Sequence, residues 1–319
     1  NTNGASKIEF LSLSKILIDF GFALLGLMIG SFLNVIIYRL PQISEIQYRS
    51  IGAEYIENFF KYKRIKNRFN QKRKFKNPKT RLGVSSNDDD YTLSSPKSHC
   101  PNCLRTLSWS ENIPLISFLI LKGRCRTCKN PIAKTYPLVE FISAAGALYI
   151  STRFYLPVTE NLEVAHLLIK TASLCIFFWI CIALLIIDIR THTLPDLLTL
   201  GLMWLGIVFS LTSTTGLALE SAVLGAIFGY TSLWLIYKVY KFFTNKEGMG
   251  YGDFKLTAAI CTWIGVESLA LLLLIASLAG ALLGGILLIT GKLKRDDAMP
   301  FGPFLILSGF ILIHTNPSI

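Results

Sequence analysis

Residues 165–188 read AHLLIKTASLCIFFWICIALLIID, and this stretch decides the fold class. The apolar run 165–187 is long enough to cross a membrane, because about 20 helical residues span roughly 30 Å of hydrocarbon. It ends in Asp188. A second aspartate, Asp253, begins another apolar run after the glycine-rich sequence GMGYGD at 248–253. Ionisable groups at membrane depth are functional candidates, because they are costly to keep there.

The composition extends this interpretation to the whole chain. Of the 319 residues, 52% are hydrophobic and 16% are charged, and the mean hydropathy is +0.49. Such a chain is too apolar for an ordinary water-soluble domain. We predict an all-α polytopic membrane protein with about eight transmembrane helices, of which the sixth and eighth are short enough to be half-helices. The predicted spans are 16–38, 136–156, 165–187, 195–212, 218–238, 253–266, 267–290 and 301–315.

The distribution of Lys and Arg predicts the orientation in the membrane. The segment 39–135, between the first two spans, carries 20 of the 32 basic residues and seven acidic residues. Basic residues gather on the cytosolic side, so this segment is expected there, with both termini on the other side. The basic residues of the short connections fall on the same side under this topology: Arg190, Lys238, Lys241, Lys246, Lys292, Lys294 and Arg295. No cleavable signal peptide is expected, because the first apolar run is too long.

Under this topology Asp188 and Asp253 both reach the cytosolic face, at the ends of spans that run in opposite directions. Gly250 and Gly252, just before Asp253, have no side chains, and this suits the close approach of an extended substrate. The simplest alternative is that each aspartate is a helix-end carboxylate solvated by lipid headgroups.

A pair of close carboxylates has a specific chemical use. Ionising both groups costs free energy, because the two negative charges repel each other. One group therefore stays protonated and the other charged at neutral pH. They can then act as general acid and general base on a peptide bond, with water as the nucleophile. Helix dipoles favour Asp253, at a helix N-terminus, as the base and Asp188, at a C-terminus, as the acid, although a coupled pair titrates jointly.

Cysteine spacing predicts a metal site in the segment between the first two spans. Two Cys-x-x-Cys pairs lie 21 residues apart, which is close to the zinc-ribbon pattern. Four thiolates make a closed site without an open position for catalysis, so we predict structural Zn²⁺. The predicted ligands are Cys100, Cys103, Cys125 and Cys128, with His99 as a bystander. Cys175, Cys181 and Cys261 lie in apolar runs and are predicted to be core residues.

These signals divide the chain into four predicted parts. They are a first transmembrane helix (1–41), a basic cytosolic insertion (42–98), a zinc-binding domain (99–135) and a seven-helix membrane domain (136–319). Within the insertion, residues 61–81 mix Lys and Arg with aromatic side chains. Nucleic-acid binding is one interpretation, but directly after a span such a segment more often lies on anionic lipid headgroups, and we expect lipid and no nucleic acid.

The chain resembles the bacterial type IV prepilin leader peptidase/N-methyltransferase family from about residue 22 onward. The motifs that carry the resemblance are Gly30–Pro41, the two cysteine pairs with Trp109, Glu111–Pro114, Tyr136–Glu140, Asp188 with Leu194–Asp196, Glu247–Lys255 and Pro300–Pro303. The chain departs from the family in its longer basic insertion. It also departs at Leu104, where such cysteine turns often carry Gly.

The resemblance implies an aspartic endopeptidase of the Gly-x-Gly-Asp type in the bacterial inner membrane. Its substrates would be type IV prepilins and pilin-like secretion precursors (pseudopilins), cut after the glycine that ends a short basic leader, at the cytosolic membrane face. Asp188 and Asp253 would be catalytic. The resemblance also implies S-adenosylmethionine-dependent methylation of the new N-terminus. No dinucleotide-type glycine motif supports that activity, and the surroundings of Asn112, Gly123 and Arg124 are the proposed place for it.

Five further expectations concern individual residues and motifs. Asp196 is predicted to cap the fourth span, with a third catalytic carboxylate as the alternative, and Lys255 is predicted to act on Asp253 or face headgroups. Glu140 is predicted to pair with a substrate amine or to snorkel toward the interface. The Pro300–Pro303 turn is expected to line the cleft. Three Gly-x-x-x-Gly motifs are predicted to be helix-packing faces: Gly26–Gly30, Gly225–Gly229 and Gly280–Gly284.

Two other classes of function fit parts of the pattern. An ion-coupled transporter would use its acidic residues as a relay, but such residues belong near the bilayer midplane and often within inverted repeats, and no internal repeat is apparent. A non-catalytic pilus-assembly scaffold would use the zinc domain to recruit partners. Replacing either aspartate by Asn distinguishes the peptidase from the scaffold.

Overall fold

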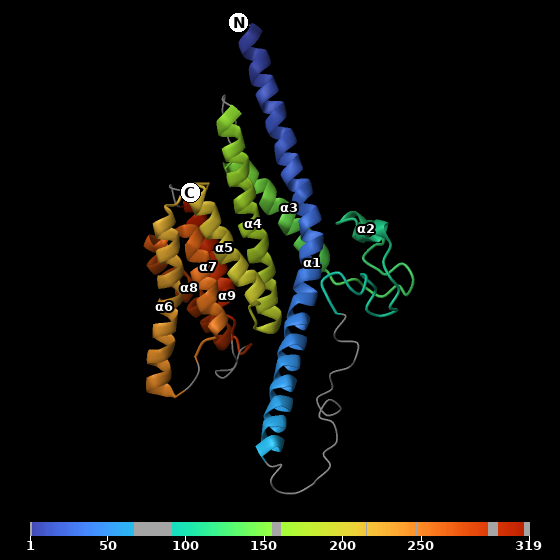
Figure 1. The fold of residues 1–319 in the computed structure, drawn as a ribbon. Coiled ribbons are helices and arrows are strands. Elements are labelled where there is room, and N and C mark those ends of the chain that lie inside the picture. Colours follow the sequence, from blue (N-terminus) through green and yellow to red (C-terminus); the bar gives the residue numbers. More distant parts are fainter. Residues whose placement is uncertain are drawn as a thin grey trace.

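The computed structural model describes residues 2–66, 91–154, 161–214, 216–245, 248–292 and 299–315. Within these ranges the chain is helical and contains no strand, only two isolated bridges in the zinc domain (Figure 1). The helices are α1 (Thr2–Lys66), α2 (Ile116–Ile120), α3 (Thr135–Phe154), α4 (Asn161–Thr191), α5 (Asp196–Leu211), α6 (Leu219–Thr244), α7 (Tyr251–Ile264), α8 (Leu269–Ile289) and α9 (Gly302–Thr315), with short 3-10 turns η4 (Trp109–Asn112) and η5 (Val266–Ser268).

Helix α1 is much longer than the predicted span 16–38. It continues through Pro41, which lies inside the helix, and on to Lys66. The predicted boundary between residues 41 and 42 therefore does not coincide with a helix end, and the first part of the predicted insertion is helical. Residues 67–90 lie outside the described residues, and with them most of the basic aromatic segment 61–81.

The apolar stretches form helices at all eight predicted places, but only some are long enough to cross a bilayer. Four helical segments of the described chain combine the required length and hydropathy: Ser14–Ser50, Val164–Thr191, Leu219–Thr244 and Val266–Ile289. Asp196–Leu211 and Gly302–Thr315 are apolar but shorter. The structure thus supports a membrane protein with at least four spanning segments.

Helix α7 forms the centre of the bundle. It packs against α5, α6 and α9, and its side chains are buried from Leu256 to Ile264. A helix that is apolar on all sides requires such enclosure. Gly225 and Gly229 of α6 permit the close packing, since a Cβ atom on Gly225 would lie 2.6 Å from the Cys261 carbonyl oxygen. The prediction that these glycines form a packing face is confirmed.

The other two glycine motifs behave differently from each other. Gly26 of α1 lies against the α3 backbone, where a Cβ atom would be 2.6 Å from the Ser143 carbonyl oxygen, and Gly30 is equally close to α3. That packing face is also confirmed. By contrast, Gly280 and Gly284 of α8 contact only side chains, at ordinary distances for Gly280.

Arg39 of α1 holds the segment 91–96, which leads into the zinc domain, against the first helix. Its Nη1 donates hydrogen bonds to the carbonyl oxygens of Thr92 (3.1 Å) and Leu93 (3.0 Å), and its Nη2 donates to the carbonyl of Pro96. The guanidinium also lies over the Tyr91 ring, 5.9 Å from its centroid. The basic end of the Gly30–Pro41 motif therefore has a structural role.

We expect Arg39→Gln to loosen the chain that enters the zinc domain. Each lost hydrogen bond to a charged donor is worth roughly 1.5–3 kcal/mol. Limited proteolysis should therefore cut residues 91–98 faster in this variant. Arg49→Gln is the control, because Arg49 is exposed and its ion pair is with Glu45 of the same helix. Equal cleavage of the two variants would contradict the assignment.

Candidate active site and metal centre

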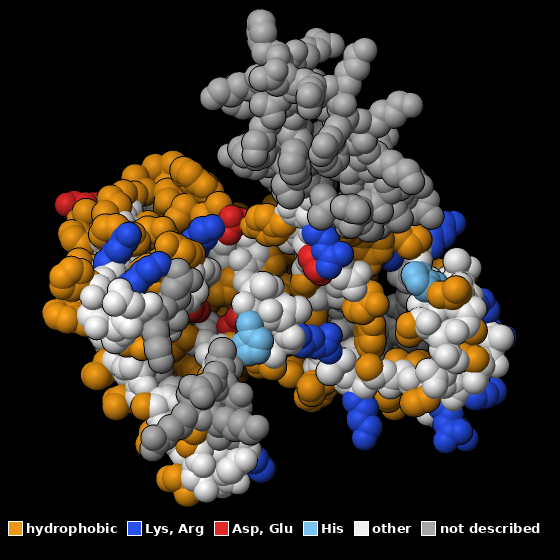
Figure 2. Space-filling view, turned by 90° about the horizontal axis from the view of Figure 1, so that it is seen from below, with side chains coloured by type: hydrophobic (Ala, Val, Ile, Leu, Met, Phe, Trp, Pro, Cys, Tyr) orange, Lys and Arg blue, Asp and Glu red, His pale blue; other side chains and the backbone are white. Residues whose placement is uncertain are grey.

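The structure brings Asp188 and Asp253 together at one end of the bundle. Asp188 lies in the last turn of α4 and is 4% exposed, while Asp253 lies in the first turn of α7 and is 8% exposed. The two carboxyls are close enough for Asp188 to act electrostatically on Asp253. Seen from below, acidic side chains are visible in a hollow of the surface (Figure 2). The helix positions predicted for both residues are confirmed.

The Pro300–Pro303 turn lies against Asp188. A Cβ atom on Gly302, the first residue of α9, would be 2.5 Å from Asp188 Oδ2, so only glycine fits there without a shift. This oxygen is buried and accepts no hydrogen bond from the described residues. A buried acceptor without a donor is costly and rare, and it marks a place where a water or substrate group would bind.

Gly302 also changes the helix-dipole argument for the two aspartates. Its backbone N–H, at the N-terminus of α9, interacts with the Asp188 carboxyl. The C-terminus of α4 disfavours negative charge on Asp188. A second helix N-terminus acts in the opposite direction, so dipoles do not distinguish the acid from the base. The sequence offered no signal for this contact, because α9 is far along the chain.

The two glycines before Asp253 have different surroundings. Gly250 precedes α7, and a Cβ atom there would meet nothing closer than Asp253 Oδ2 at 3.9 Å, which leaves an open side next to the carboxyl. On Gly252 a Cβ atom would lie 3.0 Å from the Leu194 side chain. Gly252 thus permits packing of the α4–α5 connection, whereas Gly250 leaves room for a substrate.

The structure corrects the expectations for three neighbouring residues. Asp196 does not cap α5, which begins after Pro195 without a side-chain cap. It instead accepts a hydrogen bond from Lys255 Nζ at 2.6 Å, so Lys255 pairs with Asp196 rather than with Asp253. Glu140 is buried and neither snorkels nor is free for a substrate amine, since its Oε2 accepts the Leu115 N–H at 2.8 Å.

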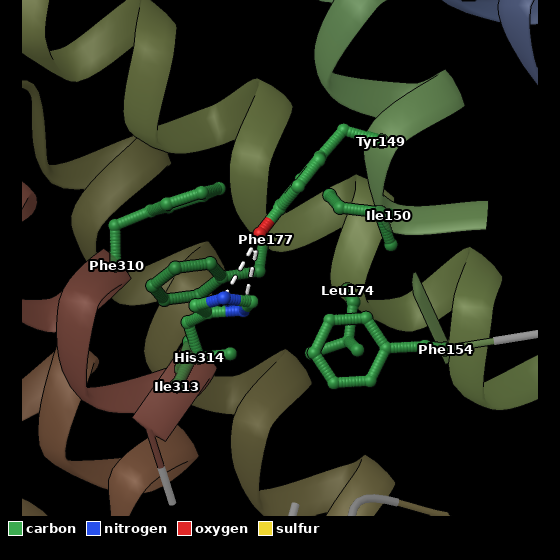
Figure 3. Close-up of a pocket in the computed structure, with 8 residues that line it drawn as sticks. All are labelled: Tyr149, Ile150, Phe154, Leu174, Phe177, Phe310, Ile313 and His314. Atoms are coloured by element: carbon green, nitrogen blue, oxygen red, sulfur yellow. Dashed lines mark hydrogen bonds between the residues drawn. The ribbon is translucent and has the colours of Figure 1, made fainter. Parts of the chain in front are cut away.

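Open space lies beside the glycine turn. A groove of about 270 Å³ is lined by Ile236, Tyr237, Tyr240, Gly248 and Met249. A second cavity, of about 20 Å³, lies where α3, α4 and α9 meet near His314, whose ring bonds the Tyr149 hydroxyl (Figure 3). His314 is at the opposite end of α9 from Gly302, and this cavity holds no more than a single water. The larger space lies between α6 and the start of the glycine turn at Gly248 and Met249.

The four cysteines of the zinc domain have the geometry of a metal site. Their sulfur atoms all lie within 4.8 Å of one another, with 3.8 Å between Cys100 and Cys128 and 4.0 Å between Cys103 and Cys125. A tetrahedral zinc ion with Zn–S bonds of about 2.3 Å requires separations of about 3.8 Å. The donor set therefore fits Zn²⁺, and His99 lies outside it. The three remaining cysteines are buried in the bundle, as predicted.

The two cysteine turns repeat one backbone structure. The Cys100 N–H bonds the Arg105 carbonyl, and the Cys125 N–H bonds the Asn130 carbonyl, both at 2.9 Å. Leu104 and Lys129 occupy equivalent positions with φ of 56° and 57°. The turn at Leu104 thus forms despite the absence of the glycine expected there. This short repeat was missed in the sequence, because the two turns share little beyond their cysteines.

Backbone N–H groups favour thiolates at the second turn. Donation from Asn130 lowers the pKa of Cys128 to about 6, and donation from Cys128 and Thr127 lowers the pKa of Cys125. At the first turn the Arg105 N–H favours the thiolate of Cys103, but burial and the neighbouring sulfurs raise its pKa to about 11. A divalent cation bound by the four sulfurs would offset the repulsion between thiolates and so favour ionisation of Cys103.

Comparison with known proteins identifies the family. A family model described as "Bacterial Peptidase A24 N-terminal domain" matches residues 24–154, and one described as "Type IV leader peptidase family" matches residues 175–285. A curated relative from Aeromonas hydrophila is 39% identical over 93% of this chain and 90% of its own length. The chain belongs to the type IV leader peptidase family.

Other relatives in the type IV leader peptidase family agree. The protein from Legionella pneumophila is 38% identical over 93% of this chain and 91% of its own length. The protein from Pseudomonas aeruginosa is 36% identical over 91% and 88%. All three relatives carry the name prepilin leader peptidase/N-methyltransferase. No solved structure matches the chain at a significant level.

Proposed function

We propose that this member of the type IV leader peptidase family removes the leader from type IV prepilins and pseudopilins and methylates the new N-terminus, with Asp188 and Asp253 as the catalytic pair. The family and the names of the relatives support both activities. The observation that carries the residue assignment is the burial of both aspartates at one end of the bundle, where Gly302 lies against both Asp188 and Leu256 of α7 and one oxygen of Asp188 has no partner among the described residues.

The pair suits hydrolysis of a peptide bond through water. The ionised carboxyl takes a proton from the attacking water, and the protonated carboxyl donates to the developing oxyanion or the leaving amine. The open side at Gly250 admits an extended peptide next to Asp253. No covalent intermediate is needed. The two aspartates titrate as a coupled pair, so the starting proton is assigned to the pair and not to one residue.

The membrane arrangement follows from charge and helix length. We infer eight spans in the bacterial inner membrane, with α3, α5, α7 and α9 crossing beside the four long helices. The shorter helices among them would cross where the bilayer is locally thinner. The excess of Lys and Arg in 39–135 places the aspartates at the cytosolic face. A precursor anchored by its own apolar helix would then present its scissile bond at headgroup depth, and Gly250 is the proposed approach point.

Zinc and the methyl donor have separate roles in this proposal. Zn²⁺ would stabilise the domain 99–135, which lies in the chain between α1 and the membrane domain that begins near residue 136. Its ligands would be Cys100, Cys103, Cys125 and Cys128. S-adenosylmethionine is implied by the relatives' names, and Asn112, Gly123 and Arg124 remain the proposed surroundings. Gly123 has φ of +67° and lies under the Phe118 ring. Anionic lipid remains the proposed partner of 61–81.

The purified protein with a prepilin precursor tests the function directly. Mass spectrometry should report both loss of the leader and the addition of one methyl group. An intact precursor after long incubation would overturn the peptidase assignment. Neither the transporter nor the scaffold has support from the comparisons.

Gly302→Ala tests the geometry of the pair without touching a carboxyl. The added methyl group must displace the Asp188 side chain, and a misplacement of about 1 Å can reduce a rate by about 10²-fold. We expect a loss of this order in leader cleavage. Gly201→Ala is the control, because nothing lies within 4 Å of a Cβ atom there. Full activity of Gly302→Ala would show that Asp188 need not be held as described.

A further inference from the structure

The zinc domain presents an apolar face that the described residues leave uncovered. In α2, Ile116, Leu119 and Ile120 lie on one side of the helix, and Leu119 and Ile120 are 72% and 73% exposed. The neighbouring turn η4 packs against α2 and carries Trp109, which is 82% exposed. These four residues are called the α2 face. A group of large apolar side chains this exposed indicates an interaction surface.

Contacts with α3 and α1 fix the depth of this face relative to the membrane helices. Leu115, directly before α2, donates its N–H to Glu140 in α3 at 2.8 Å. Glu140 in turn lies against α1, where a Cβ atom on Gly30, the residue before Ser31, would be 2.7 Å from the Glu140 Cα. Ser31 lies seven residues before Tyr38, where the predicted first span ends, and therefore roughly 10 Å deeper along the helix. The α2 face thus begins at the level of apolar helix surface, not beyond it.

The arrangement in space agrees with this depth. In Figure 1, α2 lies on the side of the zinc domain that is nearer the N-terminal, apolar half of α1. An exposed apolar face at this level would meet the headgroup and upper acyl region of the lipid, because interfacial segments bury their apolar side about 5–10 Å into that boundary.

The charges around the face favour anionic lipid. Residues 112–139 contain five basic residues and no acidic residue. Four of the basic residues follow α2 closely and are exposed: Lys122, Arg124, Arg126 and Lys129. Lys and Arg side chains surround the lobe at the right of Figure 2, where the zinc domain lies. A tryptophan and aliphatic side chains beside cations are typical of segments that rest on anionic membranes.

We propose that the α2 face inserts into the interface of an anionic lipid leaflet and fixes the zinc domain against the membrane. The ligand is the lipid surface itself, and the cations hold the headgroups. The inference goes beyond leader cleavage and methylation, and it stands or fails independently of both.

Quenching of Trp109 fluorescence tests the insertion. The full-length protein is reconstituted in vesicles of phosphatidylcholine and phosphatidylglycerol, and the emission of Trp109 is obtained as the difference from Trp109→Phe. Bromine atoms on the upper acyl chains should remove most of this emission, and aqueous acrylamide should remove little. Strong quenching by acrylamide would overturn the proposal. So would resistance to both quenchers, which would indicate that protein covers the face.

Two comparisons sharpen the test. Quenching by brominated lipid should be weaker in phosphatidylcholine alone, and equal quenching in both vesicles would remove the anionic part of the proposal. Leu119→Glu combined with Ile120→Glu should make Trp109 accessible to acrylamide, whereas Leu119→Met should not. Retention of zinc by the variants shows that the domain stays folded. If the double variant loses zinc, the lipid dependence of the unaltered protein still decides the outcome.

Discussion

Asp188→Asn and Asp253→Asn are each expected to reduce leader cleavage by about 10²–10⁴-fold, because an amide can neither accept the proton of the attacking water nor donate one as a carboxylic acid does. The double variant should be little worse than either single variant, since the two groups act as a unit. Cleavage of a purified prepilin, followed by mass spectrometry under single-turnover conditions, measures the effect.

Asp196→Asn is the matched control for these variants. Asp196 lies near the same end of the bundle, but its side chain is half-exposed and forms a single ion pair with Lys255. Such a pair contributes at most about 1 kcal/mol, so cleavage should remain close to normal. An equal loss in all three variants would point to general destabilisation of this end of the bundle. Normal cleavage by either Asp188→Asn or Asp253→Asn would remove that residue from the catalytic pair.

Loss of zinc is expected to unfold the domain 99–135. Structural zinc in small domains contributes about 10–16 kcal/mol, and this domain has few other buried residues to hold it together. Cys125→Ser should therefore abolish stoichiometric zinc, and limited proteolysis should then cut between residues 99 and 135. Because metal binding requires thiolates, zinc should also be released as the pH falls below the range in which the cysteines ionise.

Cys181→Ala provides the comparison for the zinc experiment. Cys181 is buried in α4, away from the metal site, so its replacement should leave the zinc content unchanged. Normal zinc content in Cys125→Ser would contradict a four-cysteine site. The membrane helices should stay folded in either case, and their helical signal separates local unfolding from global unfolding.

The sequence predicted what depends on local pattern. Apolar runs and cysteine spacing were sufficient to predict the helices, the clustering of the four cysteines and the helix-end positions of the two aspartates, because each rests on local sequence. The catalytic and metal-binding roles of these residues stay predictions. Contacts between distant segments were not predictable. Three features depend on tertiary packing: the position of Gly302 against Asp188, the pairing of Lys255 with Asp196, and the burial of Glu140. The extent of α1 was also missed, because Pro41 usually indicates a helix end.

The enclosure of α7 limits which part of the protein can adapt to a precursor. Asp253 lies in the first turn of a helix that packs against three neighbours and is buried from Leu256 to Ile264, so displacing that helix would disrupt a close-packed interior. Asp188, by contrast, lies in the last turn of α4, and Gly302 begins the short helix α9 next to it. Any closure around a bound peptide would therefore come from movement of Asp188 and α9, while Asp253 stays in place.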